Sequence, residues 1–245
     1  MLEVKHLLIV SHSKTIANFE ECRVFLKIGN LLVLSGNIIL MATIIFDFDH
    51  TLFNTQNIRK NIKNIFIKNG VPEEILEASN KKHRESNNDT YDLLEHIAEI
   101  ENEGYSINKN DVNLFFEQNL EIHLKGPVKE VLSSLMTAGH KLILLSKGKE
   151  AFQRFKVKQS GIETYFGKHI YICYEKKEEM IEKIPREGKT YFINDHADEI
   201  ESVSKKHPEI NFIYIKGPKT PHDRFIKHGR IPTIDDISSL PELIK

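Results

Sequence analysis

Five short runs of β-branched and apolar residues, separated by longer amphipathic segments, constrain the fold of this chain most strongly. They read TIIFDF, KLILLS, HIYIC, TYFIND and NFIYIK, at residues 43–48, 141–146, 169–173, 190–195 and 211–216. Helical patterns lie between them, at residues 127–138, 150–160 and 178–184. Apolar strands that alternate with helices are typical of a parallel sheet with both faces covered. The pattern therefore predicts an α/β protein built on a parallel sheet.

Residues 56–124 interrupt this alternation directly after the first run. Ile58, Ile62 and Phe66 lie on one helical face, and further helical patterns cover residues 73–84, 91–103 and 111–120. We expect a small all-helical cap domain at 56–124, inserted into a core domain formed by residues 41–55 and 125–245. An insert at this place can act as a lid over a site at the strand end.

Residues 1–40 precede the predicted core. Residues 24–46 are the most apolar part of the chain, but Lys27, Asn30, Gly36 and Asn37 interrupt them. A membrane span needs about 20 apolar residues, a length that this segment reaches only by including the first core strand. Because Met41 stands just before that strand, we expect residues 1–40 to be a dispensable extension or not part of the native protein. An extra element packed on the core and a membrane anchor are the alternatives.

Charge and cysteine content limit the partners and the compartment. The 34 Lys and Arg residues nearly balance the 35 Asp and Glu residues, so no overall field favours nucleic acid or an anionic membrane. Cys22 and Cys173 form no disulfide framework or zinc cluster. We expect a cytoplasmic protein with a small-molecule partner and without nucleic acid or membrane binding. The basic stretch over residues 216–230 is expected to be a solvated loop, and the oligomeric state stays open.

Polar residues stand at the ends of three runs, where ligands bind in open parallel sheets. Asp47 and Asp49 end the first run, and two such carboxylates on one face of an extended segment favour a cation or unequal protonation. Asp47 can attack phosphorus, while Asp49 protonates the leaving oxygen and later activates water. Ser146 ends the second run, and with the backbone of Lys147 and Gly148 it could hold a phosphoryl oxygen. A helix cap is the alternative for Ser146.

The third polar signal closes the run at residues 190–195. Asp195 is suited to Mg²⁺, a hard cation that prefers oxygen ligands. Glu199 could support that ion through water or orient a neighbour, and an acidic first helical turn is an equal alternative for it.

Together these residues resemble the haloacid dehalogenase-like (HAD) hydrolase superfamily over residues 43–245, with D-x-D-x-T at residues 47–51 as the most specific element. The resemblance implies a Rossmann-like core with a helical cap, Asp47 as nucleophile and Asp49 as general acid/base. It also implies Mg²⁺ on the carboxylates of Asp47 and Asp195 and on the carbonyl of Asp49. Thr51 and Ser146, with Lys147 and Gly148, would bind the substrate phosphate.

The family also needs a lysine to neutralise the phosphoryl group and the nucleophile. Lys176 and Lys177 both qualify, and we slightly prefer Lys176. Lys156 and Lys158 on the preceding helix are less suited. Either of the preferred lysines, without this context, would be a surface residue.

Two positions depart from the family pattern. His50 replaces the glycine common between the second Asp and the Thr, so a side chain enters that turn; a structural role is favoured over substrate contact. Asn194 replaces the usual Gly or Asp before Asp195, which makes the outer acidic shell less certain.

Asp49 also separates the reactions that the family catalyses. A halide leaves without a proton, whereas an alkoxide benefits from one, so Asp49 favours phosphoryl transfer over carbon–halogen cleavage. We expect Mg²⁺-dependent hydrolysis of a small phosphate monoester. A phosphomutase or phosphotransferase, and a non-catalytic relative that binds a phosphorylated ligand, stay open, as does the substrate.

Overall fold

The computed structural model describes residues 7–9, 24–28, 31–34, 37–174, 176–217 and 231–244, with side chains from residue 41 onward. Most of the predicted basic stretch at residues 216–230 lies outside this described part.

Six parallel strands form the central sheet, in the order β10–β9–β8–β5–β6–β7. The strands are β5 (Ala42–Phe46), β6 (Lys141–Lys147), β7 (Ile170–Cys173), β8 (Lys189–Asn194), β9 (Asn211–Ile215) and β10 (Thr233–Ile234). The first five coincide with the five predicted runs, which confirms the α/β fold with a Rossmann-like parallel sheet. β10 has two residues, too short for a sequence pattern, and was not predicted.

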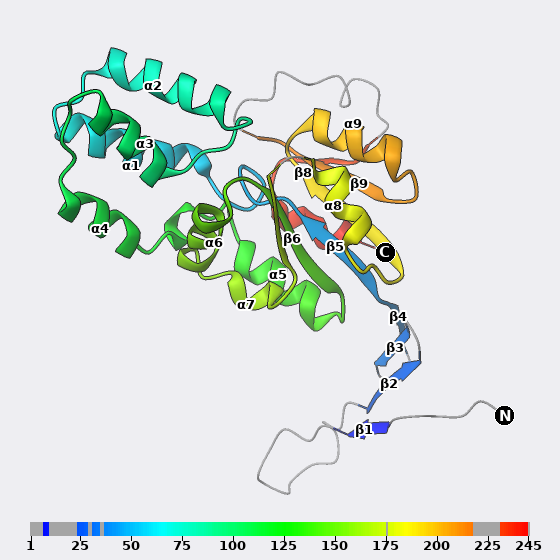
Figure 1. The fold of residues 1–245 in the computed structure, drawn as a ribbon. Helices are drawn as coiled ribbons and strands as arrows, with labels where there is room; N and C mark the ends of the chain where they lie inside the picture. The colour runs from blue at the N-terminus through cyan, green and yellow to red at the C-terminus, as the bar shows by residue number, and fades with distance from the viewer. Residues whose placement is uncertain are drawn as a thin grey trace, which may run out of the picture.

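Helices cover both faces of this sheet (Figure 1). Ile44 and Phe46 of β5 pack in one apolar cluster with residues of α5 (Val128–Thr137), α6 (Glu150–Gln159), α7 (Glu163–Phe166) and α11 (Leu240–Leu243). Ile45, between them, packs in a second cluster with residues of α8 (Lys177–Lys183) and α9 (Ala197–Lys206). Since successive strand side chains point to opposite faces, burial on both faces explains why these strands are continuously apolar.

Four helices follow β5 and lie at one end of the core, coloured cyan to green in Figure 1. They are α1 (Thr55–Lys68), α2 (Glu73–Ser86), α3 (Leu93–Asn102) and α4 (Lys109–Glu117), followed by the 3₁₀ turn η2 (Glu121–His123). The chain enters and leaves this region side by side, because the amide of Lys125 donates to the carbonyl of Leu52 at 2.9 Å. We call α1–α4 and η2 the cap.

A second, antiparallel sheet precedes the core. Its strands are β1 (Leu7–Ile9), β2 (Val24–Ile28), β3 (Leu31–Leu34) and β4 (Asn37–Leu40), paired in that order, and Figure 1 shows them extending away from the parallel sheet. That residues 1–40 are a dispensable extension stays a prediction. In the described part of the chain, no helix has both the length and the apolar character that crossing a bilayer requires.

Candidate active site

The carboxyl ends of β5, β6 and β8 meet at the edge of the sheet that faces the cap. Asp47 directly follows β5, and its amide donates to the carbonyl of Ile193 in β8 at 2.9 Å. Asp195 directly follows β8. The structure therefore brings two of the predicted carboxylates to neighbouring strand ends, as the topology requires.

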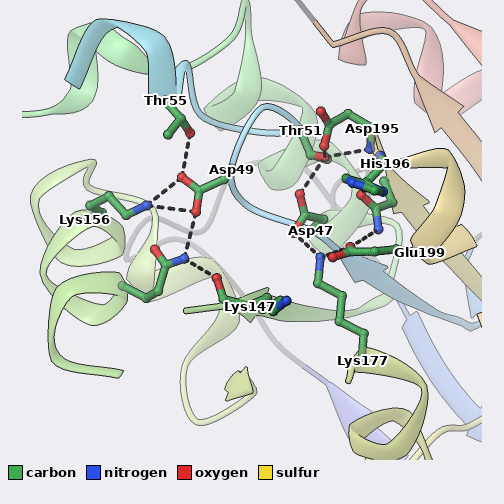
Figure 2. Close-up of polar contacts among 12 residues, drawn as sticks. Asp47, Asp49, Thr51, Thr55, Lys147, Lys156, Lys177, Asp195, His196 and Glu199 are labelled. Carbon is green, nitrogen blue, oxygen red and sulfur yellow. Dashed lines mark hydrogen bonds and ion pairs between the residues drawn. The ribbon is translucent and has the colours of Figure 1, made fainter. Parts of the chain in front are cut away.

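Asp47 is enclosed by two hydrogen-bond donors (Figure 2). Its Oδ1 lies 2.5 Å from Nζ of Lys177, and its Oδ2 accepts a hydrogen bond of 2.9 Å from Oγ1 of Thr51. Burial raises the pKa of Asp47 above its ordinary value even though Lys177 opposes this shift. The carboxylate is thus fixed in orientation, but it is poorly solvated.

Lys177, and not Lys176, is the lysine that reaches the nucleophile position. Its side chain is 4% exposed and also lies 2.6 Å from Oε2 of Glu199. Burial alone would lower the pKa of Lys177, but the carboxylates of Asp47 and Glu199 raise it, so the ammonium stays charged. Lys176 precedes the first turn of α8 and is exposed. Our preference for Lys176 is therefore wrong.

Glu199 is engaged with protein groups. Its Oε2 accepts hydrogen bonds from Lys177 and, at 2.8 Å, from Nδ2 of Asn194. Of the two roles predicted for Glu199, the structure shows the orientation of a neighbour. Its contact with Lys177 is that of a counterion, and its support of a metal ion through water stays a prediction. Asn194 links this pair to the start of α9, since its Oδ1 accepts from the amide of His196 at 3.0 Å.

Asp195 lies opposite Asp47, with Thr51 between them. Oγ1 of Thr51 lies 3.3 Å from Oδ1 of Asp195 and accepts from its amide at 3.1 Å. Among the described residues Asp195 forms no ion pair, and burial followed by the charge of Asp47 raises its pKa to about 7. A Cβ on Gly217 would lie 2.6 Å from Oδ2 of Asp195, so only glycine allows the chain to pass this close.

These two carboxylates fit a hard divalent cation. The charges of Asp47 and Asp195 repel each other, and burial raises the pKa of both carboxyl groups. Carboxylate oxygens are ligands that Mg²⁺ prefers, and the ion usually keeps several waters. No three metal-ligating side chains converge within the part of the chain that the structure describes. A bound ion would therefore depend on Asp47, Asp195, the carbonyl of Asp49 and water, as the family resemblance implies.

Asp49 belongs to a separate group of contacts (Figure 2). Nζ of Lys156 lies 2.6 and 2.8 Å from its two oxygens, Nε2 of Gln153 donates at 2.7 Å, and Oγ1 of Thr55 donates at 2.5 Å. Burial would raise the pKa of Asp49, but Lys156, with help from Thr55 and Gln153, holds it well below its usual range. The structure thus holds Asp49 as a carboxylate.

Both aspartates line one cavity, but their side chains contact different helices. Asp47 contacts Lys177 of α8, whereas Asp49 contacts Lys156 of α6, and these helices pack in the two different apolar clusters. The reason is that the chain turns after β5: the amides of Leu52 and Phe53 both donate to the carbonyl of Phe48, at 3.0 Å. The strand β5 ends at Phe46, and the chain turns after Phe48.

The end of β6 carries the predicted phosphate-binding residues. Ser146 is fully buried, and its Oγ has no hydrogen-bond partner within the described structure. Such a group is costly unless a ligand or water satisfies it. The carbonyl of Lys147 accepts a bond of 2.6 Å from Gln153. A Cβ on Gly148 would lie 2.6 Å from the side-chain Nε2 of Gln153. The absence of a side chain at Gly148 therefore permits Gln153 to reach Asp49.

His50 adopts the left-handed conformation that usually favours glycine, with φ of 62°. Its carbonyl accepts from Nζ of Lys125 at 2.5 Å, which helps to fix the turn. Burial lowers its pKa to about 4, so the imidazole is neutral at pH 7. These contacts are structural, but His50 also lines the cavity described next.

A cavity of about 590 Å³ lies between this edge of the sheet and the cap. Asp47, Asp49, Lys177 and Asp195 form its floor, and residues of α1, α2 and α3 line the cap side. This volume suits a small organic ligand. The sequence alone did not indicate the cap residues that line it, since they come from several segments.

The fold and this arrangement place the protein among α/β proteins with an acidic site at the carboxyl edge of a parallel sheet. The family model described as haloacid dehalogenase-like hydrolase matches residues 41–209. The chain therefore belongs to the haloacid dehalogenase-like hydrolase family, which confirms the resemblance based on D-x-D-x-T. No curated protein matches the chain.

Solved structures share the fold. A protein from Burkholderia xenovorans described as a haloacid dehalogenase-like hydrolase aligns with a TM-score of 0.63 and 16% identity, over 82% of this chain and 97% of its own. The HAD-hydrolase YfnB from Bacillus subtilis, bound to magnesium, gives 0.55 and 17%, over 84% and 99%. A protein from Clostridium difficile described as a phosphatase gives 0.57 and 16%, over 84% and 99%. At these identities the likeness is one of fold.

Proposed function

We propose that the protein hydrolyses phosphate monoesters, with Asp47 as covalent nucleophile and Mg²⁺ as the required ion. The observation that carries this proposal is the arrangement around Asp47, which is held between Lys177 and Thr51 and faces Asp195. The unpartnered hydroxyl of Ser146 and the nearby Asp49 support it. The fold relatives that bind magnesium or are described as a phosphatase agree with this proposal.

In the first step, an oxygen of Asp47 attacks phosphorus and the bond from phosphorus to the leaving oxygen breaks. Lys177 holds the attacking carboxylate in place and offsets the charge that the phosphoryl group brings. Ser146 would donate its hydroxyl proton to a phosphoryl oxygen, which would satisfy its buried Oγ. A magnesium ion on Asp47 and Asp195 would supply further neutralisation of phosphate charge.

Asp49 serves both proton transfers. As an acid it gives its proton to the leaving oxygen; as a carboxylate it then takes a proton from the water that attacks the phosphorylated Asp47. The structure shows the second of these states, because Lys156 keeps Asp49 ionised. We infer that substrate binding loosens this contact, so that Asp49 can carry a proton in the first step.

Hydrolysis of p-nitrophenyl phosphate, with Mg²⁺ and with EDTA, tests the proposal. Wild-type protein should release phosphate only with Mg²⁺; Asp47→Asn should be inactive, and Asp49→Asn should be slower by about 10²–10⁴-fold. Near-normal turnover by Asp47→Asn would refute the nucleophile. Adding a sugar phosphate as acceptor separates the alternatives, since a mutase transfers the group instead of releasing phosphate.

A further inference from the structure

One face of α1 forms a wall of the cavity, which runs from the carboxylates at its floor into the cap. Its residues at helical spacing, Thr55, Ile58, Arg59, Ile62, Lys63 and Phe66, all line the cavity. Thr55 donates to Asp49 at 2.5 Å, which anchors the first turn of α1 at the reacting groups. A leaving group that extends from the phosphate must therefore pass along this face.

Arg59 is a cation on this wall that forms no close ion pair in the described part of the chain, although the charges of Asp49 and Asp89 act on it. Lys63 pairs with Glu73, and Arg84 lies 3.2 Å from Asp89. Arg59 forms no hydrogen bond or ion pair with any residue that the structure describes, although it is exposed to the cavity that it lines. An unpaired guanidinium beside a ligand cavity is a ready site for an anion.

The surroundings of Arg59 strengthen this reading. Arg84 of α2 lines the same cavity, and its guanidinium lies 5.7 Å from the centre of the Tyr91 ring. Burial and then the charge of Arg84 lower the pKa of Arg59. The cap side thus holds two neighbouring guanidinium groups and two carboxylates: Glu77, and Asp89, which pairs with Arg84 and whose side chain is 80% exposed. An anion between the two guanidinium groups would relieve their repulsion.

The position of Arg59 also sets the scale of the ligand. Arg59 stands four residues after Thr55, so its Cα lies roughly 6 Å further along the helix axis. Ile58, Ile62 and Phe66 give the same wall an apolar surface. The wall therefore suits a compact leaving group with an apolar body and a charged far end.

We propose that the substrate is a phosphate monoester whose leaving group carries a second anionic group, a carboxylate or a phosphate, which Arg59 binds. This inference rests on the proposed phosphatase function and names its substrate class. The planar fork of arginine matches both anions with two parallel hydrogen bonds. Arg59 is a specificity-determining residue in this account, and it takes no part in bond making or breaking.

Matched aryl phosphates test the inference. We would measure kcat/KM for phenyl phosphate, 4-carboxyphenyl phosphate and 1,4-phenylene bisphosphate with wild type, Arg59→Gln, Arg59→Lys and Lys60→Gln. Lys60 is the matched control, since it is exposed on the same helix and does not line the cavity. The readout is the ratio of kcat/KM for each substrate with a second anionic group to that for phenyl phosphate.

Arg59→Gln should lower this ratio about 10–150-fold, the range for a charged hydrogen bond of about 1.5–3 kcal/mol. Arg59→Lys should recover part of it, and Lys60→Gln should keep the wild-type ratio. The substrate with the larger loss identifies the anion as carboxylate or phosphate. An equal loss on all substrates would mean that Arg59 acts through Asp49, and an unchanged ratio would mean that it contacts no anion; either result overturns the inference.

Binding separates this inference from the phosphatase proposal. Titration of 4-carboxyphenylphosphonate, which cannot be hydrolysed at the phosphorus–carbon bond, should show tighter binding than phenylphosphonate in wild type but not in Arg59→Gln. Such binding without turnover of any phosphate would refute the phosphatase and keep the anion site. Turnover without dependence on Arg59 in either assay would refute the anion site and keep the phosphatase.

Discussion

Replacing Lys177 by Met tests the charge arrangement at the nucleophile. The side chains of Lys177 and Asp47 are 4% and 6% exposed, and Glu199 is the second partner of Lys177. Breaking a buried ion pair by removing one partner costs about 3–5 kcal/mol, because it leaves an uncompensated charge. Glu199 is 25% exposed and can regain water, so we expect a loss of about 3 kcal/mol in the free energy of unfolding.

A double-mutant cycle isolates the pair from the loss of packing. Asp47→Asn removes the carboxylate charge and keeps the shape of the side chain. If the charges interact as the 2.5 Å contact indicates, the double variant should be more stable than the sum of the two single changes predicts, by about 1–3 kcal/mol. Additive effects would mean that the contact between Lys177 and Asp47 does not contribute to stability.

Urea unfolding at pH 7.5 in EDTA is the assay. The chain has seven tyrosines and no tryptophan, so tyrosine fluorescence and far-UV circular dichroism are the two probes, and coincident transitions establish two-state unfolding. Lys176→Met is the control, and as an exposed change it should shift the free energy by less than about 0.5 kcal/mol. A larger effect for Lys176→Met than for Lys177→Met would refute our assignment of the lysine.

Three further predictions concern protons and metal. Lys156→Gln should move every limb of the pH–rate profile that reports Asp49 to higher pH, because Lys156 is the main group that lowers the pKa of Asp49; an unchanged profile would contradict this. The free energy of unfolding should fall by about 2–3 kcal/mol as the pH drops from 6.5 to 4, because burial lowers the pKa of His96 to about 4 and the unfolded chain takes up the proton first; urea titrations across this range should show a smaller fall in His96→Gln. Mg²⁺ binding, followed by calorimetry, should tighten as the pH rises to about 7 and should release protons, because the pKa of Asp195 is about 7; binding that is independent of pH, or that persists in Asp195→Asn, would contradict the assignment.

The sequence was sufficient to predict the sheet and its acidic edge. Continuous apolar runs that are bounded by helical segments are compatible with few folds other than a parallel α/β sheet. In such a sheet the carboxyl ends of the strands meet at one edge. Asp47 and Asp195, which are 148 residues apart in the chain, could therefore be placed together without coordinates. The proximity of these two aspartates depends only on β5 and β8 being neighbours in the sheet, and β5 does pair with β8.

The choice between Lys176 and Lys177 needed more than the sequence holds. One position along a helix rotates a side chain by about 100°, so the answer depends on where α8 begins. The pattern predicted a start at residue 178, whereas Lys177 is the first residue of α8. A shift of one residue at a helix end is within the ordinary uncertainty of such boundaries, and it reversed the preference.

The contacts of Asp49 were missed for a different reason. Lys156 lies 107 residues from Asp49 in the chain, and no local pattern connects them. A signal was present: Phe152, Gln153 and Lys156 lie within about one turn of α6, the helix that follows β6. Whether these three residues reach the site depends on which face of α6 points toward it. The packing of the cap on that helix decides this.

The environments of Asp47 and Asp49 explain how two identical side chains so close in sequence can take different roles. Burial raises the pKa of Asp47, whereas Lys156 holds that of Asp49 low, and such opposite shifts are how paired acids divide catalytic work. Without a further cation, however, the pKa of Asp47 lies above that of Asp49. This is unfavourable for a nucleophile, because Asp47 is then the more easily protonated of the two carboxylates. Asp195 adds to this difficulty, since it is a second buried carboxylate without an ion pair in the described chain. A divalent cation between Asp47 and Asp195 would favour the ionised form of both. If Asp47 is the proposed nucleophile, the same two residues that would favour Mg²⁺ binding would therefore make that nucleophile dependent on the ion.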